Sequence, residues 1–117
     1  EFVNDVRSLI ADTGVEIEII MAFTPAVSTT NTRLFSAIEE VTSERYAGSR
    51  VIPSVASGFT DSHFTRDLGI ASYGFDPIVV PESDSIRIHG NDERVSVEAF
   101  KRGVVDHLAI IGSVVYD

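Results

Sequence analysis

Cysteine is absent from the 117-residue sequence, which excludes disulfide bonds, thiolate metal sites and a cysteine nucleophile. Basic residues are scarce, since nine Lys and Arg stand against eighteen Asp and Glu and give a formal net charge of −9. A surface that binds nucleic acid needs clustered cations, so nucleic acid is not an expected partner. No apolar run reaches the roughly eighteen residues that a membrane-spanning helix needs, so no contact with a membrane is expected.

The composition that remains is globular. It is 44% hydrophobic, 23% charged and 9% aromatic, which excludes intrinsic disorder, collagen-like repeats and a coiled coil. The length suits one ordinary domain and is too short for two. The chain starts at Glu1 without a methionine, so a targeting segment was removed or never included. Composition therefore predicts a soluble acidic globular domain. It does not decide the compartment, for which a cytoplasmic location is slightly favoured.

The first part of the chain predicts a helix followed by a strand. Apolar residues recur at spacings of three and four over residues 2–10, which is typical of an amphipathic helix. Gly14 is expected to end this helix in a left-handed conformation. Strict alternation over residues 15–19 predicts a strand with one buried face and one acidic face. Because no capping residue precedes the helix, we expect the chain to begin inside a larger domain.

Helices and short strands alternate in the rest of the chain. Thr30 or Asn31 is expected to cap a helix whose apolar face contains Leu34, Phe35, Ile38 and Val41. Residues 51–55 and 70–75 are predicted strands, and residues 78–95 a long loop. Ser96 is expected to cap the last helix, with a buried stripe of Val97, Phe100, Val104, Leu108 and Ile111.

This order predicts an α/β fold with parallel strands and flanking helices in layers, because helices separate the strands. Two such strands cannot complete a sheet. The missing strands are therefore expected either upstream of this sequence or in a second copy of the chain.

The turn around Gly58 and Thr60 is the first candidate site. A glycine-containing turn between a strand and a helix exposes backbone N–H groups, which favour a carboxylate or a developing oxyanion, and Thr60 adds a hydroxyl group. The alternative is that Thr60 caps the following helix and Gly58 permits the turn. Capping is the commoner role of threonine at a helix start.

His89 is the second candidate. Histidine is the commonest metal ligand, and Gly90 lets another group approach it closely. Asp92 and Glu93 are placed to fix the ring, as ligating histidines usually require. The alternative is an exposed loop histidine, because a metal site needs three or four ligands and only one is obvious here.

The other titratable residues favour structural roles. His107 is expected on the surface of the last helix, and Asp61 with His63 resembles a fragment of a catalytic pair at a helix start, where aspartate usually compensates the helix dipole. The sequence contains no G-x-S-x-G, no H-E-x-x-H and no phosphate-binding loop.

Three strings together resemble the C-terminal part of the M20 family of zinc metallopeptidases. They are SGFTDSHFTRDLGI at residues 57–70, YGF at 73–75 and HGNDERVS at 89–96, in that order and followed by a closing helix. The resemblance is strong over residues 57–103. Members of this family include carboxypeptidases, aminoacylases and deacetylases that act on N-acylated amino acids.

The resemblance implies a three-layer catalytic domain interrupted by an α+β lid domain that forms a homodimer contact. Residues 1–23 would then be the last helix and strand of the lid, and residues 24–117 the end of the catalytic domain. His89 would bind one of two zinc ions, with cobalt or manganese as alternatives. Gly58 and Thr60 would line the cleft for a small peptide or an N-acyl amino acid, although Phe59 stands where many relatives have a small residue.

The resemblance also implies what this chain does not supply. The family's other metal ligands and its general-base glutamate lie upstream, and they are needed for a metal-activated water to attack an amide carbonyl. We therefore expect the isolated chain to be an inactive piece of a di-zinc amidohydrolase. The alternative is a stand-alone, non-catalytic α/β module for interaction or dimerisation, derived from that family.

Overall fold

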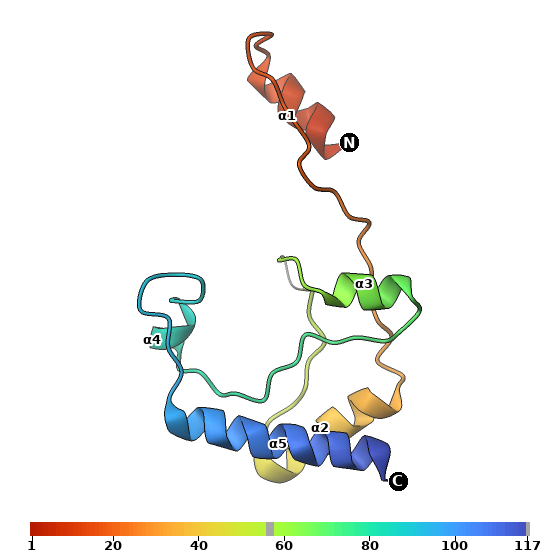
Figure 1. The fold of residues 1–117 in the computed structure, drawn as a ribbon, viewed down its shortest axis with the longest axis vertical. Helices are drawn as coiled ribbons and strands as arrows, with labels where there is room; N and C mark the ends of the chain where they lie inside the picture. Colours follow the sequence, from red (N-terminus) through yellow and green to blue (C-terminus); the bar gives the residue numbers. More distant parts are fainter. Residues whose placement is uncertain (56–57, 117) are drawn as a thin grey trace.

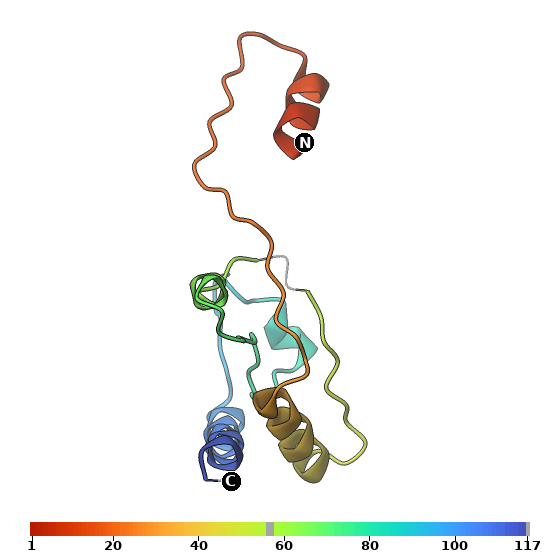
Figure 2. The same ribbon diagram turned by 90° about the vertical axis from the view of Figure 1, so that its right-hand side faces the viewer.

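The computed structural model describes residues 1–55 and 58–116. Five helices lie within these residues, and Figures 1 and 2 show α2 and α5 side by side while α1 projects away from them. The molecule is elongated, with principal extents of 59 × 36 × 22 Å. The helices are α1 (Phe2–Ile10), α2 (Arg33–Arg45), α3 (Ser62–Asp67), α4 (Glu82–Ser85) and α5 (Val97–Val115).

The predicted α/β fold with parallel strands is wrong for the described residues, since none of them belongs to a strand. Residues 15–19, 51–55 and 70–75 run instead as irregular connections between helices. A strand exists only when its N–H and C=O groups pair with a second strand. Among the described residues, the backbone hydrogen bonds outside the helices are local turns and caps, and none joins two of these segments. These three segments therefore have the sequence pattern of strands but lack a neighbouring segment to pair with among the described residues.

Helix α1 confirms the predicted amphipathic helix but ends differently. Ala11, with φ 48°, takes the left-handed position at its C-terminus, and its N–H donates to the carbonyl of Arg7. Gly14 lies beyond the helix and donates to the Asp12 side chain at 2.8 Å. Phe2 and Leu9 are 77% and 85% exposed, so this helix has no buried face.

Helix α2 buries the face that its spacing predicts. Its cap is Thr32, whose hydroxyl accepts from the Phe35 N–H at 3.1 Å, rather than Thr30 or Asn31. Ala37, Ile38 and Val41 are buried against Ile110 of α5 and form the core of the described residues. The partly buried hydrophobic residues around this core are Leu34, Val51, Tyr73, Phe75, Ala109 and Val114.

Helix α5 has the predicted cap and a different buried face. The Ser96 hydroxyl accepts from the Ala99 N–H at 3.1 Å, as expected. The buried residues are Gly103, Asp106 and Ile110. The predicted buried stripe is wrong, because its members are 46–69% exposed: Val97, Phe100, Val104, Leu108 and Ile111.

Two contacts explain why α5 buries a different face: an ion pair between α2 and α5, and the close approach of the chain before α4 to α5. Asp106 of α5 pairs with Arg45, the last residue of α2, at 3.1 Å. A Cβ on Gly103 would lie 2.6 Å from Cγ1 of Ile78, so the chain before α4 reaches α5 only because this position is glycine. The side of α5 that is buried was therefore decided by its contacts with Arg45 and with the chain around Ile78, and not by the number of apolar residues on each side of the helix.

The segment over residues 78–95 contains a short helix that the sequence did not predict. Helix α4 begins after Pro81 and has Glu82 and Asp84 in its first turn, where acidic side chains favour the helix dipole. The predicted boundary between residues 1–23 and residues 24–117 stays a prediction.

Candidate functional site

An aromatic cluster lies at the N-terminal end of α3. The ring of Phe23 stacks on that of Phe59 with centroids 4.3 Å apart, and it meets the imidazole of His63 edge-on at 4.6 Å. Phe64 closes the cluster, 5.8 Å from Phe59. Phe59 therefore anchors the turn to the segment before α2.

A polar network holds the same region from the other side. Arg66 of α3 donates through Nε to the Ser28 hydroxyl at 3.0 Å and through Nη2 to the Ser72 carbonyl at 2.7 Å. The Ser72 N–H donates to the Ser28 hydroxyl at 2.9 Å. Thr65 and Ser72 join their hydroxyl groups at 2.6 Å. One arginine thus ties α3 and the chain just after it to the segment before α2, which lies 38 residues earlier in the sequence.

Between these contacts lies a cavity of about 600 Å³. Its walls come from the chain before α2, residues 51–55, the turn that begins α3 and the chain around Tyr73. Most of the wall is apolar, with Phe23, Phe35 and Phe75 among its residues, and His63 and Arg66 supply polar groups. The cavity is open at one side and suits an apolar group that carries a polar end.

Gly58 and Thr60, the predicted cleft residues, both line this cavity. Ser57 of the same turn lies outside the described residues. Apart from its chain neighbours, no atom of the described residues lies within 4 Å of the place where a Cβ on Gly58 would stand, so a close approach from elsewhere in them does not demand glycine there. The Thr60 hydroxyl does not cap α3, because the cap position belongs to Asp61, whose side chain makes no capping hydrogen bond.

His63 pairs with a different aspartate from the one its spacing suggested. Its Nε2 lies 3.2 Å from Oδ2 of Asp67, one helical turn further on, and its side chain is 15% exposed. The pair lies along α3 beside the cavity wall. Asp61 takes the capping position instead, so Asp61 and His63 do not form a catalytic pair in this structure.

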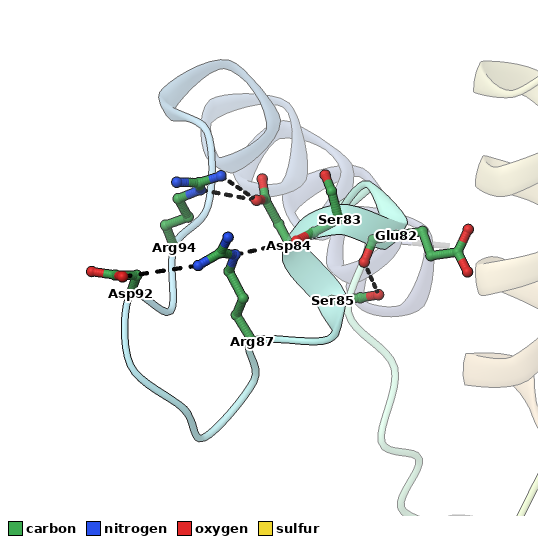
Figure 3. A network of polar contacts seen from close by, with 7 residues as sticks. All are labelled: Glu82, Ser83, Asp84, Ser85, Arg87, Asp92 and Arg94. Carbon is green, nitrogen blue, oxygen red and sulfur yellow. Dashed lines mark hydrogen bonds and ion pairs between the residues drawn. The ribbon is translucent and has the colours of Figure 1, made fainter.

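His89 lies in the loop between α4 and α5 in an unusual backbone conformation. Its φ is 62°, and that of Asp92 is 61°, a left-handed region that non-glycine residues rarely occupy. The Glu93 carboxylate accepts from the His89 backbone N–H at 3.1 Å. The side chains of Asp92 and Arg87 face one another (Figure 3), and a carboxylate oxygen of Asp92 lies 3.9 Å from Nη1 of Arg87. The acidic neighbours thus contact the backbone and an arginine, while the imidazole is exposed.

A metal site cannot be assembled from the described residues alone. Among residues 1–55 and 58–116, no three His, Asp or Glu side chains lie close enough to hold a metal ion. His89 offers one imidazole where a zinc site needs three or four ligands. It also does not belong to the lining of the cavity that contains Gly58 and Thr60. The described residues therefore do not form a complete metal centre, and a metal-binding role for His89 stays a prediction.

A buried ionic contact between α2 and α5 was missed by the sequence analysis. The Asp106 side chain is 1% exposed, and it accepts from the Tyr46 hydroxyl at 2.6 Å. This hydrogen bond is the main reason that the pKa of Tyr46 is raised, and burial adds to the effect. The sequence offered one signal for this contact. Asp106 lies three residues after Gly103 and four before Ile110, so the three residues share one face of the helix.

None of the helices in the described part of the chain is long and apolar enough to cross a membrane.

The sequence model described as Peptidase family M20/M25/M40 matches residues 5–112. The chain therefore belongs to this family of hydrolases, and the predicted resemblance is confirmed. A relative from Xenopus tropicalis named N-fatty-acyl-amino acid synthase/hydrolase PM20D1 is 32% identical over 113 residues, covering 95% of this chain and 22% of that protein.

Two further relatives agree with this assignment. The Homo sapiens protein of the same name is 29% identical over 102 residues, covering 84% of this chain and 20% of its own length. A Dictyostelium discoideum protein named probable carboxypeptidase S-like 2 is 28% identical over 104 residues, covering 87% and 20%. This chain thus spans about a fifth of the length of these curated relatives. No solved structure matches it significantly.

Proposed function

We propose that this chain is part of an amidohydrolase that cleaves the amide bond of an N-acyl amino acid or a small peptide. The observation that carries the proposal is the family match over residues 5–112. The names of the relatives favour these two substrate classes, since two are called N-fatty-acyl-amino acid synthase/hydrolase and one is called probable carboxypeptidase. The apolar cavity beside Gly58 and Thr60 is compatible with an acyl group or an apolar side chain.

The metal of this proposal is zinc, as two ions, with cobalt or manganese as alternatives. His89 would supply one ligand, and the remaining ligands and the general-base glutamate would come from residues beyond these 117. A metal of this kind lowers the pKa of a bound water and polarises a carbonyl group. This chain's own part is to present the imidazole of His89 and, through Gly58 and Thr60, to bind the substrate. On its own the chain would be inactive.

The alternative function is a non-catalytic module that dimerises through residues 1–23. The observation in its favour is the apolar face of α1, where Phe2 and Leu9 are 77% and 85% exposed. Such a face is a common mark of a protein interface. A dimer contact through this segment is also compatible with the enzyme, so it is proposed for both functions.

The decisive experiment is the His89→Ala substitution in the protein as its gene encodes it. We expect loss of bound zinc and of nearly all hydrolysis of an N-acyl amino acid. His107→Ala is the matched control, because His107 is exposed on α5 and has no part in the proposal. Wild-type zinc content and turnover in His89→Ala would contradict the assignment, and a zinc-free, stably dimeric wild type would favour the alternative module.

A further inference from the structure

We infer that Asp84 and Arg94 are positioning residues that clamp the His89 loop onto α4. The inference rests on the proposed function, in which His89 binds a metal ion. The contact between Asp84 and Arg94 would hold the His89 imidazole in one place for that ion. Asp84 lies in α4 and Arg94 lies just before α5, so their contact joins the two ends of the loop that contains His89 (Figure 3).

The contact between the two side chains is close and forked. Both Nε and Nη2 of Arg94 lie near one carboxylate oxygen of Asp84, at 2.9 and 2.8 Å. Charge-assisted hydrogen bonds from a planar guanidinium group are short and directional. The Asp84 side chain is only 17% exposed, so water competes for it less than for a free surface carboxylate. The pair can therefore fix the distance between the two ends of the loop.

A second layer of contacts lies inside the clamped loop. Glu93, next to Arg94, accepts from the His89 backbone N–H at 3.1 Å. The Gly90 N–H donates to the carbonyl of Arg87 at 2.8 Å, and Arg87 donates through Nε to the Ser83 carbonyl at 3.3 Å. The position of Arg94 thus affects the backbone of His89 through Glu93, which is next to Arg94 in the chain and accepts from the His89 N–H. Releasing Arg94 should also release the carboxylate that holds the His89 backbone.

The backbone of His89 explains why a clamp is needed. A left-handed conformation costs free energy in a residue with a Cβ, and it persists only where surrounding contacts impose it. His89 and Asp92 both have this conformation, with φ of 62° and 61°. Without the contact between Asp84 and Arg94, the loop would relax toward ordinary backbone angles. The direction of the imidazole would change with it.

The experiment uses Asp84→Asn and Arg94→Gln in the protein as its gene encodes it. Asp84→Asn preserves the size of the side chain, Arg94→Gln shortens it, and each substitution removes one charge. We expect zinc affinity, measured by competition with a chelator, to fall by about 10- to 100-fold, the usual effect of losing a group that orients a ligand. Backbone hydrogen exchange over residues 86–95 should become faster at the same time.

Arg102→Gln is the matched control. Arg102 pairs with Glu98 on the exposed side of α5 at 3.6 Å and closes no loop. This substitution should leave zinc affinity and exchange in residues 86–95 unchanged. The double charge reversal, with Asp84→Arg and Arg94→Asp together, should recover part of both properties, because the attraction between the two ends of the loop is restored.

The outcomes separate the clamp from the proposed function. If His89→Ala abolishes zinc binding while Asp84→Asn and Arg94→Gln behave as wild type in both measurements, the clamp is wrong and the role of His89 stands. If His89→Ala keeps wild-type zinc affinity, the proposed function fails. Hydrogen exchange then still decides whether the clamp exists, since slow exchange in the wild type and fast exchange in both variants supports it and equal exchange overturns it.

Discussion

The hydroxyl of Tyr46, just after α2, donates a 2.6 Å hydrogen bond to Oδ2 of Asp106, a side chain that is 1% exposed in the middle of α5. Nη1 of Arg45 lies 3.1 Å from the other carboxylate oxygen, as an ion pair rather than an aligned hydrogen bond. A buried carboxylate is costly unless such partners compensate its lost hydration. The packing of α2 on α5 therefore depends on these two residues as well as on the apolar core.

Tyr46→Phe should destabilise the helix pair. The substitution keeps the ring and removes a hydrogen bond to a buried charged group, so we expect the free energy of unfolding to fall by about 1.5 kcal/mol. Urea unfolding followed by circular dichroism measures the loss. Tyr116→Phe is the control, because Tyr116 is 88% exposed. Equal unfolding midpoints for the two variants would contradict the role of the hydrogen bond.

Stability should decrease in alkaline solution through the same tyrosine. The hydrogen bond to Asp106 raises the pKa of Tyr46 above the ordinary 10.0, so the folded state favours the neutral phenol. This contribution is complete below pH 10.0 and is lost as the pH rises from there through the raised folded pKa. Tyrosinate absorbance during an alkaline titration of the wild type should include a late step from Tyr46. The prediction is wrong if that step persists in Tyr46→Phe.

Gly103→Ala should destabilise the protein although alanine favours helices. The new Cβ would lie 2.6 Å from Cγ1 of Ile78, and overpacking of this kind costs about 1–3 kcal/mol. Gly112→Ala in the same helix meets no atom within 4 Å and should stabilise by up to about 1 kcal/mol through helix propensity. Thermal unfolding of the two variants tests this opposite sign, and a stabilising Gly103→Ala would refute the close approach.

Thr32→Ala should weaken α2, whereas Thr30→Ala should not. The Thr32 hydroxyl caps the helix and also lies 2.6 Å from the Tyr73 hydroxyl. Loss of a cap costs about 1 kcal/mol, and the second contact should add to it. Thr30→Ala removes no capping contact and should stay within about 0.5 kcal/mol of the wild type. Urea midpoints that rank the two variants the other way would restore Thr30 as the cap.

Part of the candidate site could be predicted from the sequence. The string around His89 led to the M20 family, which the family match confirms. Gly58 and Thr60 were predicted to line a substrate cleft; both line a cavity, and their contact with a substrate stays a prediction. The contact between Asp84 and Arg94 could not be predicted, because α4 was taken for a loop and the two residues are ten positions apart. Their pairing depends on how the chain between them turns.

The sequence by itself determined helices α1, α2 and α5. Caps such as Ser96 and the apolar spacing of α1 and α2 act within a few residues of the chain, so local rules find them. Only the tertiary structure decided which side of α5 is buried. Asp106 is buried because it contacts α2, and Gly103 is buried because the chain around Ile78 packs against it. The tertiary structure also decided that residues 51–55 and 70–75 are not strands, because a strand requires hydrogen bonds from a second segment and those bonds are non-local.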